Sequence, residues 1–286
     1  MRAKAAANHH KIRPFCAPAS CGTKAQLRTV TPIGRDLLVK AGKGPGTVEG
    51  RLRERLLSIY VQLRERFGPS HWWPAESAFE VCVGAFLTQG TSWANVERAL
   101  DSLRRRGRLS FHGLAQVPAS RLAPWIRSSG FYQVKAQRLR AFVRFLGREH
   151  GGEVRRLRKR GLAGARADLL ALPGVGPETA DAILLYAAGL PTFVVDSYTR
   201  RVFRRLGILG GDESYEEVRQ TFLRNLPRRV GLYNDYHAQI VTLAKTHCRS
   251  VPRCTGCPLG ADCPRTGVGD RAKIASRGAS RFRRER

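Results

Sequence analysis

The chain has 286 residues, with 51 Lys and Arg against 22 Asp and Glu, so its formal net charge is +29. A charge of this size attracts polyanions, and nucleic acid is therefore the first partner to expect. No apolar run approaches the roughly 18 residues of a membrane-spanning helix, and no charged start leads into an apolar signal core. The sequence thus argues against a membrane partner, and we expect a cytoplasmic protein.

Both ends of the chain are basic and lack hydrophobic periodicity. Residues 1–50 contain nine Lys and Arg among scattered Gly and Pro, and residues 266–286 are similarly rich in Arg. Segments of this composition bury too little apolar surface to fold alone. We expect a disordered basic N-terminal arm and a disordered basic tail, which attract phosphates without specificity.

Between these ends, apolar residues recur at helical spacing in several segments. The predicted helices cover 52–67, a stretch that starts near residue 75, 95–107 and 134–147. Residues 149–167 are rich in Gly and Arg, and we interpret them as a connector with a solvated basic surface.

The stretch Leu172–Tyr198 carries the clearest local pattern. Gly174 and Gly176 permit the positive φ of a tight turn, and Pro177 suits the first turn of the helix that follows. The N–H groups of such a turn form a small anion site that suits a phosphate, although an isolated Gly-x-Gly motif is more often only a turn. Asp196 closes the stretch as a favoured N-cap of the next helix.

Four cysteines lie within sixteen residues, spaced C-x5-C-x2-C-x5-C. In a cytoplasmic protein, thiols this close together indicate metal binding rather than disulfides. Structural zinc usually uses two C-x2-C pairs further apart, whereas four cysteines also hold iron–sulfur clusters. The four predicted ligands are Cys248, Cys254, Cys257 and Cys263.

LPGVG, the helix after it, and VVD followed by a second helix resemble the helix-hairpin-helix and Gly/Pro-Asp signature of the endonuclease III superfamily of DNA glycosylases. The resemblance covers about residues 50–265 and implies an all-α, two-lobed fold that acts on double-stranded DNA. In that family the hairpin, here Gly174, Val175 and Gly176, holds a DNA phosphate. The family aspartate, here Asp196, stabilises the sugar cation or activates water as the base is removed.

Two adjacent tryptophans precede the second predicted helix, a position where aromatics usually pack at the edge of a core. WWP, a helix and then TQ-x-T nevertheless resemble the subgroup that contains 3-methyladenine glycosylases, in which aromatics sandwich the flipped base. The resemblance implies that Gln89 fills the hole left in the DNA, although many relatives have Asn or Ala in place of Gly90. The implied base-pocket residues are Trp72, Trp73, Pro74 and Trp93.

The segment GFYQ-x-KA resembles the family's GLYN-x-KA loop, whose apolar residue wedges into the duplex. Phe131 takes that place here, although a partly buried loop aromatic would also explain it. Inserting such a wedge costs a few kcal/mol of unstacking, which contacts to the bent DNA must offset.

Bifunctional members of the superfamily have a lysine that forms a Schiff base, and Glu178 stands at that position. A carboxylate cannot form an imine, so the resemblance implies a monofunctional enzyme in which water attacks the sugar. The 3-methyladenine subgroup likewise carries glutamate there. An alkylated purine is positively charged and would gain roughly 0.5–2 kcal/mol from cation–π contacts with an aromatic sandwich.

The cysteine loop resembles the [4Fe-4S] loop of endonuclease III, usually C-x6-C-x2-C-x5-C, with one residue fewer in the first spacer. The implied cofactor is a [4Fe-4S] cluster with a structural role. The implied domains are a cluster-bearing lobe from 51–69 and 191–265, and a six-helix domain from 70–190.

Three functions follow from these patterns. The leading one is a monomeric, nucleoid-associated, monofunctional glycosylase for alkylated purines such as 3-methyladenine. The alternatives are an endonuclease III-like glycosylase and AP lyase for oxidised or mismatched pyrimidines, and a non-catalytic DNA-binding protein.

Overall fold

The computed structural model describes residues 47–70 and 72–269. Most of the predicted N-terminal arm and C-terminal tail therefore lies outside the described residues. No strand occurs within the described ranges, so this part of the chain is helical as predicted. None of its helices is long and apolar enough to cross a bilayer.

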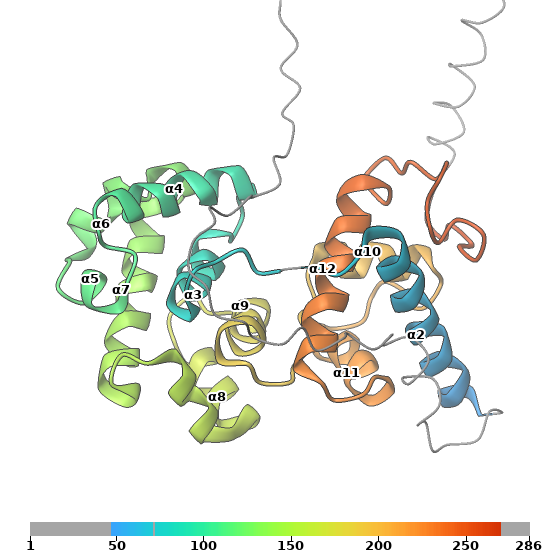
Figure 1. The fold of residues 1–286 in the computed structure, drawn as a ribbon, viewed down its shortest axis with the longest axis horizontal. Coiled ribbons are helices and arrows are strands. Elements are labelled where there is room, and N and C mark those ends of the chain that lie inside the picture. The colour runs from blue at the N-terminus through green and yellow to red at the C-terminus, as the bar shows by residue number, and fades with distance from the viewer. Residues whose placement is uncertain (1–46, 71, 270–286) are drawn as a thin grey trace, which may run out of the picture.

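The helices form two groups, seen on the left and right of Figure 1. The left group contains α3 (Ala78–Leu87), α4 (Trp93–Arg105), α5 (Phe111–Ala115), α6 (Ala119–Trp125), α7 (Tyr132–His150), α8 (Gly161–Leu170) and α9 (Pro177–Ala182). The right group contains α2 (Val48–Phe67), α10 (Ser197–Arg205), α11 (Tyr215–Asn225) and α12 (Val230–Thr246). The domain limits taken from the sequence stay predictions.

Short helical turns complete the left group. They are the 3-10 helices η1 (Arg127–Ser129) and η2 (Val154–Arg160), and a π-helical segment, η3 (Ile183–Ala188), which continues α9 without a break. The single α-helix expected after Pro177 is therefore an α-helical turn followed by a π-helical one.

The interpretation of 149–167 as a connector was wrong, because η2 and most of α8 lie within it. Only Ala165 and Leu169 of α8 are buried. The helix contains Gly161 and Gly164, which are poor helix formers. Its apolar stripe is too short for the sequence pattern to reveal a helix, and tertiary packing stabilises it instead.

Each group has aromatic side chains in its core. Phe86 of α3 packs on Phe142 of α7 with ring centroids 5.2 Å apart. In the other group Phe193 stacks on Phe222 of α11 at 3.9 Å, with the ring planes within 4°. Phe193 belongs to the segment that returns from the left group to the right, so this stack anchors the crossing point.

The buried carboxylate of Asp235 connects α2 to α12. Asp235 of α12 accepts hydrogen bonds from Tyr60 Oη at 2.7 Å and from Ser70 N at 2.8 Å. Arg64 Nη1 lies 2.6 Å from its Oδ2. These contacts fix α2 and the loop leading to the tryptophans against α12.

Candidate active site

A cleft of about 530 Å³ lies at the junction of the two groups. Its walls include two helical stripes at i, i+4 and i+8 spacing, one from each group. The first stripe is Glu178, Ala182 and Tyr186 on α9 and η3, and the second is His237, Val241 and Lys245 on α12. The cleft is therefore built from helices that are distant in sequence.

Four aromatic rings gather in this cleft. Trp73 lies 5.4 Å from Trp72, 5.4 Å from Trp93 and 5.5 Å from Tyr186, measured between ring centroids. The structure thus brings the three predicted tryptophans together and adds Tyr186, which the sequence reading missed. Pro74 is exposed and is not among the residues that line the cleft.

Trp73 packs closely against Gly84 of α3. A Cβ added to Gly84 of α3 would lie 3.1 Å from Cζ2 of Trp73, closer than ordinary van der Waals contact. On the other side of the cluster, Lys245 Nζ lies 5.8 Å from the ring centroid of Trp72, within cation–π range. The indole N–H of Trp73 is buried and has no hydrogen-bond partner in the described part of the chain.

Asp196 lies at the edge of the cleft as the N-cap of α10. Its Oδ1 accepts hydrogen bonds from Thr199 N at 2.7 Å and Thr199 Oγ1 at 2.9 Å, while Oδ2 lies 3.5 Å from His237 Nε2. Burial by itself would raise the pKa of Asp196, but the His237 charge and the Thr199 hydrogen bonds outweigh it and hold this pKa below the ordinary value. The carboxylate is therefore ionised at neutral pH.

His237 connects Asp196 to the aromatic cluster. Its Nδ1 lies 2.5 Å from the hydroxyl of Tyr186, and its side chain is only 7% exposed. The structure places His237 in the cleft between the hydroxyl of Tyr186 and the carboxylate of Asp196. Its i, i+4 spacing with Val241 and Lys245 was the available signal.

Glu178 also lines the cleft. Removal from solvent and the nearby charge of Asp196 raise the pKa of its carboxyl group, although His237 opposes the change. The pKa values of the two carboxyl groups are therefore displaced in opposite directions. Such a divergence allows one group to stay ionised while the other holds a proton.

The hairpin turn lies next to the cleft. Gly174 has φ of +73°, a left-handed conformation that favours glycine, and Val175 is buried. Gly176 is the N-cap of α9 and provides no side-chain cap. The first N–H groups of α9 are thus available to a ligand.

Gln89 is attached to this hairpin. Its Nε2 donates to the Gly174 carbonyl at 3.1 Å and to Thr179 Oγ1 at 3.0 Å, and Arg138 Nη1 donates to its Oε1 at 2.9 Å. The loop after α3 and the hairpin are therefore held together in this structure. The predicted entry of Gln89 into DNA stays a prediction.

Phe131 projects from the start of α7 and is 78% exposed. Its backbone has φ of +45° and ψ of +33°, a left-handed conformation that is unfavourable for a bulky residue. An exposed aromatic in a strained conformation is unusual, and such strain tends to persist at functional positions.

The four predicted cysteine ligands line one small cavity next to the end of α12. Arg205 Nη1 lies 3.3 Å from Cys248 Sγ and also donates to carbonyl groups of the same loop. Among the described residues, no group of His, Cys, Asp and Glu side chains has an arrangement that holds a metal ion. The four thiols share one cavity, and four thiolates are the usual donor set of an iron–sulfur cluster.

Comparison with known proteins agrees with this fold. Residues 83–228 match the HhH-GPD superfamily of base excision DNA repair proteins. The "Putative DNA repair glycosylase MJ1434" of Methanocaldococcus jannaschii is 42% identical over 212 residues, which cover 73% of this chain and 96% of the relative.

Solved structures show the same similarity. A non-covalent endonuclease III–DNA complex superimposes with a TM-score of 0.65 and 26% identity, covering 79% of this chain and 98% of the other. The H. pylori 3-methyladenine DNA glycosylase bound to 1,N6-ethenoadenine gives a TM-score of 0.58 and 28% identity, covering 69% and 97%.

The helical fold and these matches together define a DNA repair protein, and the resemblance seen in the sequence is confirmed. The chain belongs to the HhH-GPD superfamily of base excision DNA repair proteins. It is a DNA glycosylase of that superfamily, and DNA is its partner.

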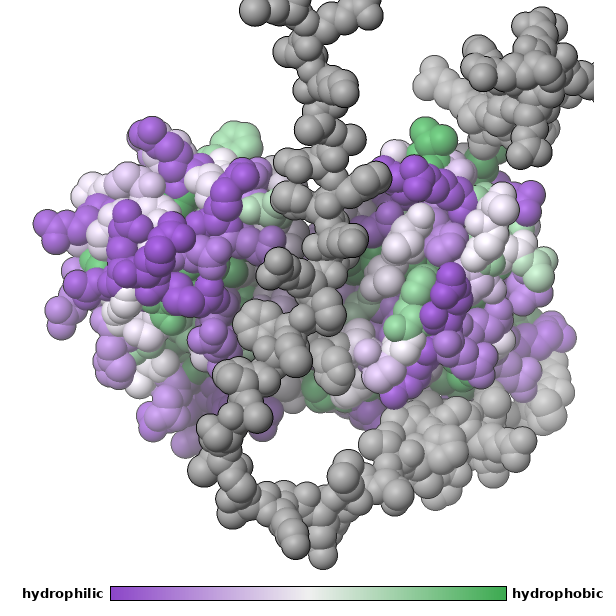
Figure 2. All heavy atoms as spheres, turned by 45° about the horizontal axis from the view of Figure 1, so that its top comes forward, coloured by the Kyte–Doolittle hydropathy of each residue, from purple (hydrophilic) through white to green (hydrophobic). Residues whose placement is uncertain are grey.

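Much of the outer surface suits this partner. Figure 2 shows hydrophilic side chains covering much of the left group, in a chain with a large excess of Lys and Arg. A chain with this excess of positive charge attracts the phosphate backbone without reading its sequence.

Proposed function

We propose that the protein is a monofunctional glycosylase that hydrolyses the N-glycosidic bond of a damaged purine, with alkylated purines such as 3-methyladenine as its substrates. The observation that carries this proposal is the ionised Asp196 at the edge of a cleft walled by Trp72, Trp73 and Trp93. Glu178 stands in the same cleft, where a bifunctional enzyme would need an amine.

DNA would be held at points around this cleft. The N–H groups of Gly174 and Gly176 and those at the start of α9 would bind a backbone phosphate, while Val175 N donates to the Leu172 carbonyl at 3.1 Å. Phe131 would enter the base stack as the damaged nucleotide rotates out, and Gln89 would occupy the vacated space. The flipped base would then lie among the tryptophan rings, against which its own ring could stack.

Asp196 would act in the bond-breaking step. Its carboxylate would stabilise the positive charge that develops on the sugar, or accept a proton from the attacking water. Effects of this kind contribute roughly 10²- to 10⁴-fold in rate. His237 supports the ionised form of Asp196. Glu178 lines the same cleft, and removal from solvent raises the pKa of its carboxyl group.

The structural neighbour from H. pylori supports a purine substrate, because it is a 3-methyladenine glycosylase seen with an ethenoadenine base. The cleft has a volume of about 530 Å³, and four aromatic rings in its walls would contact such a base.

A second candidate is a glycosylase with AP lyase activity on pyrimidine lesions, and one observation favours it. Lys245 projects into the cleft from α12, although it is far from Glu178 in sequence. Its amine is the group in the cleft that could condense with the C1′ aldehyde of an abasic site. A covalent adduct that depends on Lys245 would select this candidate.

We further propose that Cys248, Cys254, Cys257 and Cys263 hold a [4Fe-4S] cluster. The cluster would supply a rigid cross-link for a loop with little hydrophobic core, and Arg205 would bind this loop to α10.

The test is base release from duplexes containing 3-methyladenine or thymine glycol, with borohydride in a parallel reaction. Free methyladenine without a trapped adduct, and loss of activity in Asp196→Asn, would support the leading proposal. Thymine-glycol cleavage with an adduct that disappears in Lys245→Met would support the lyase. DNA binding without release of any base would indicate a non-catalytic binding protein.

A further inference from the structure

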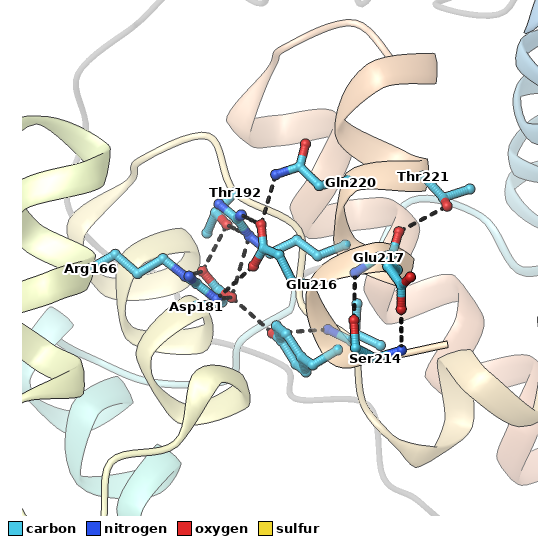
Figure 3. A network of polar contacts seen from close by, with 11 residues as sticks. Arg166, Asp181, Thr192, Ser214, Glu216, Glu217, Gln220 and Thr221 are labelled. Atoms are coloured by element: carbon cyan, nitrogen blue, oxygen red, sulfur yellow. Dashed lines mark hydrogen bonds and ion pairs between the residues drawn. The ribbon is translucent and has the colours of Figure 1, made fainter. Parts of the chain in front are cut away.

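Outside the cleft, the fully buried carboxylate of Asp181 gathers partners from both helix groups. Arg166 of α8 reaches both carboxylate oxygens, with Nε 3.1 Å from Oδ1 and Nη2 3.2 Å from Oδ2. Arg219 of α11 lies 3.4 Å from Oδ2. Figure 3 shows this network between α8, α9 and α11, with Glu216 as the second carboxylate that balances the two arginines.

The same carboxylate reaches both ends of a four-residue segment, 192–195. Thr192 Oγ1 donates to Asp181 Oδ1 at 2.9 Å, and Tyr215 Oη donates to Oδ2 at 2.9 Å. The Tyr215 hydroxyl in turn accepts from Val195 N at 3.4 Å. The residue after Val195 is Asp196, so the polar contacts end one residue from the carboxylate in the cleft.

Hydrophobic packing already anchors the middle of this segment, because Phe193 is fully buried and stacks on Phe222. Apolar burial is non-directional, whereas hydrogen bonds weaken steeply when donor and acceptor are misaligned. The contacts to Asp181 therefore add a fixed orientation to a segment that is already buried.

Asp181 also belongs to the hairpin. It lies on α9, three residues after Glu178, and Arg166 lies on α8, the helix before the Gly174–Gly176 turn. One buried carboxylate thus links the turn that would bind phosphate to the segment that presents Asp196.

We propose that Asp181 is a positioning residue that, through Thr192 and Tyr215, sets the placement of the Asp196 carboxylate relative to the hairpin. This proposal rests on the proposed function of Asp196. The network would transmit the position of the bound DNA backbone to the reacting sugar.

The decisive variant is Tyr215→Phe, which removes one oxygen between Asp181 and Val195 N and leaves the ring in place. Under single-turnover conditions we expect base release to slow about tenfold or more, since a misplacement of about 1 Å can cost on the order of 100-fold in rate. The Kd for damaged duplex should stay within about twofold, because no predicted DNA contact changes.

Two further variants serve as a second test and as a control. Asp181→Asn should slow base release at least as much as Tyr215→Phe. The substitution leaves the guanidinium groups of Arg166 and Arg219 around a neutral amide, which lowers stability. Circular dichroism must therefore show that this variant is folded. Asp168→Asn is the matched control, because Asp168 pairs with Arg160 at 2.9 Å on the outside of the hairpin. We expect a wild-type rate for this control.

A double-mutant cycle separates positioning of Asp196 from a general structural role. In an Asp196→Asn background, Tyr215→Phe should cause no further loss in the residual rate. An additive loss, or a Tyr215→Phe rate equal to that of Asp168→Asn, would overturn the positioning role. If Asp196→Asn itself keeps the wild-type rate, the proposed function fails instead.

Discussion

Gly84→Ala tests whether the shape of the aromatic cleft controls activity. The new Cβ would lie 3.1 Å from Cζ2, 3.4 Å from Nε1 and 3.5 Å from Cε2 of Trp73. The first distance is too short, so the indole ring must move by a few tenths of an ångström. Trp73 contacts Trp93 and Tyr186 in the cleft, so a shift of its ring would change the shape of the space for a base.

Two opposing effects determine how Gly84→Ala changes the free energy of unfolding. Alanine in place of glycine inside a helix stabilises by about 1 kcal/mol, while overpacking a core costs about 1–3 kcal/mol. The free energy of unfolding should thus fall by no more than about 2 kcal/mol, and the protein should remain folded. Because small misplacements of reacting groups reduce rates steeply, we expect base release to slow about three- to tenfold.

The assay is single-turnover base release together with thermal unfolding. Gly231→Ala is the matched control, because Gly231 lies in α12 and a Cβ there would meet no atom within 4 Å. We expect the control to keep the wild-type rate and to be more stable by up to about 1 kcal/mol. Equal rates for the two variants would refute the idea that the Trp73 position limits activity.

Three other outcomes are expected. His237→Gln should move the acid limb of the kcat/KM profile to higher pH. Burial raises the pKa of Asp196 and the His237 charge lowers it, so the wild-type carboxylate is protonated only as pH falls through a value below the ordinary 3.8. An unchanged acid limb would exclude this role of His237. Phe131→Gly should relieve left-handed strain of about 1 kcal/mol and raise the Tm while slowing base release, and a lower Tm would show that the ring is structural. Cys257→Ser should abolish visible absorption of the purified protein and lower its Tm, whereas retained absorption would remove Cys257 from the ligand set.

The parts of the site that lie in short, contiguous motifs could be predicted from the sequence. Trp72, Trp73 and Trp93 do meet in one cleft, and Asp196 is both an N-cap and a cleft residue. The family and the helical fold are confirmed. The roles of these residues stay predictions.

The remaining cleft residues depend on tertiary packing. One part of the cleft comes from η3, which carries Tyr186, and another from α12, which carries His237 and Lys245 about fifty residues later. A pattern along the sequence does not show that these two helices face each other. Their i+4 spacing indicated a shared face but not its partner. The polar contacts of Asp181 could not be predicted for the same reason, because only the fold brings α11 and residues 192–195 next to it.

The conformation of Phe131 has a consequence for how DNA is searched. Its side chain is already extended into solvent and its unfavourable backbone angles are already adopted in the free protein. Contact with each new base pair therefore requires no rearrangement of this loop. If Phe131 acts as the wedge, the time needed to inspect a position is set by the opening of the base pair itself. Lesions that weaken stacking or pairing would then be sampled more often than intact pairs before any chemical recognition takes place.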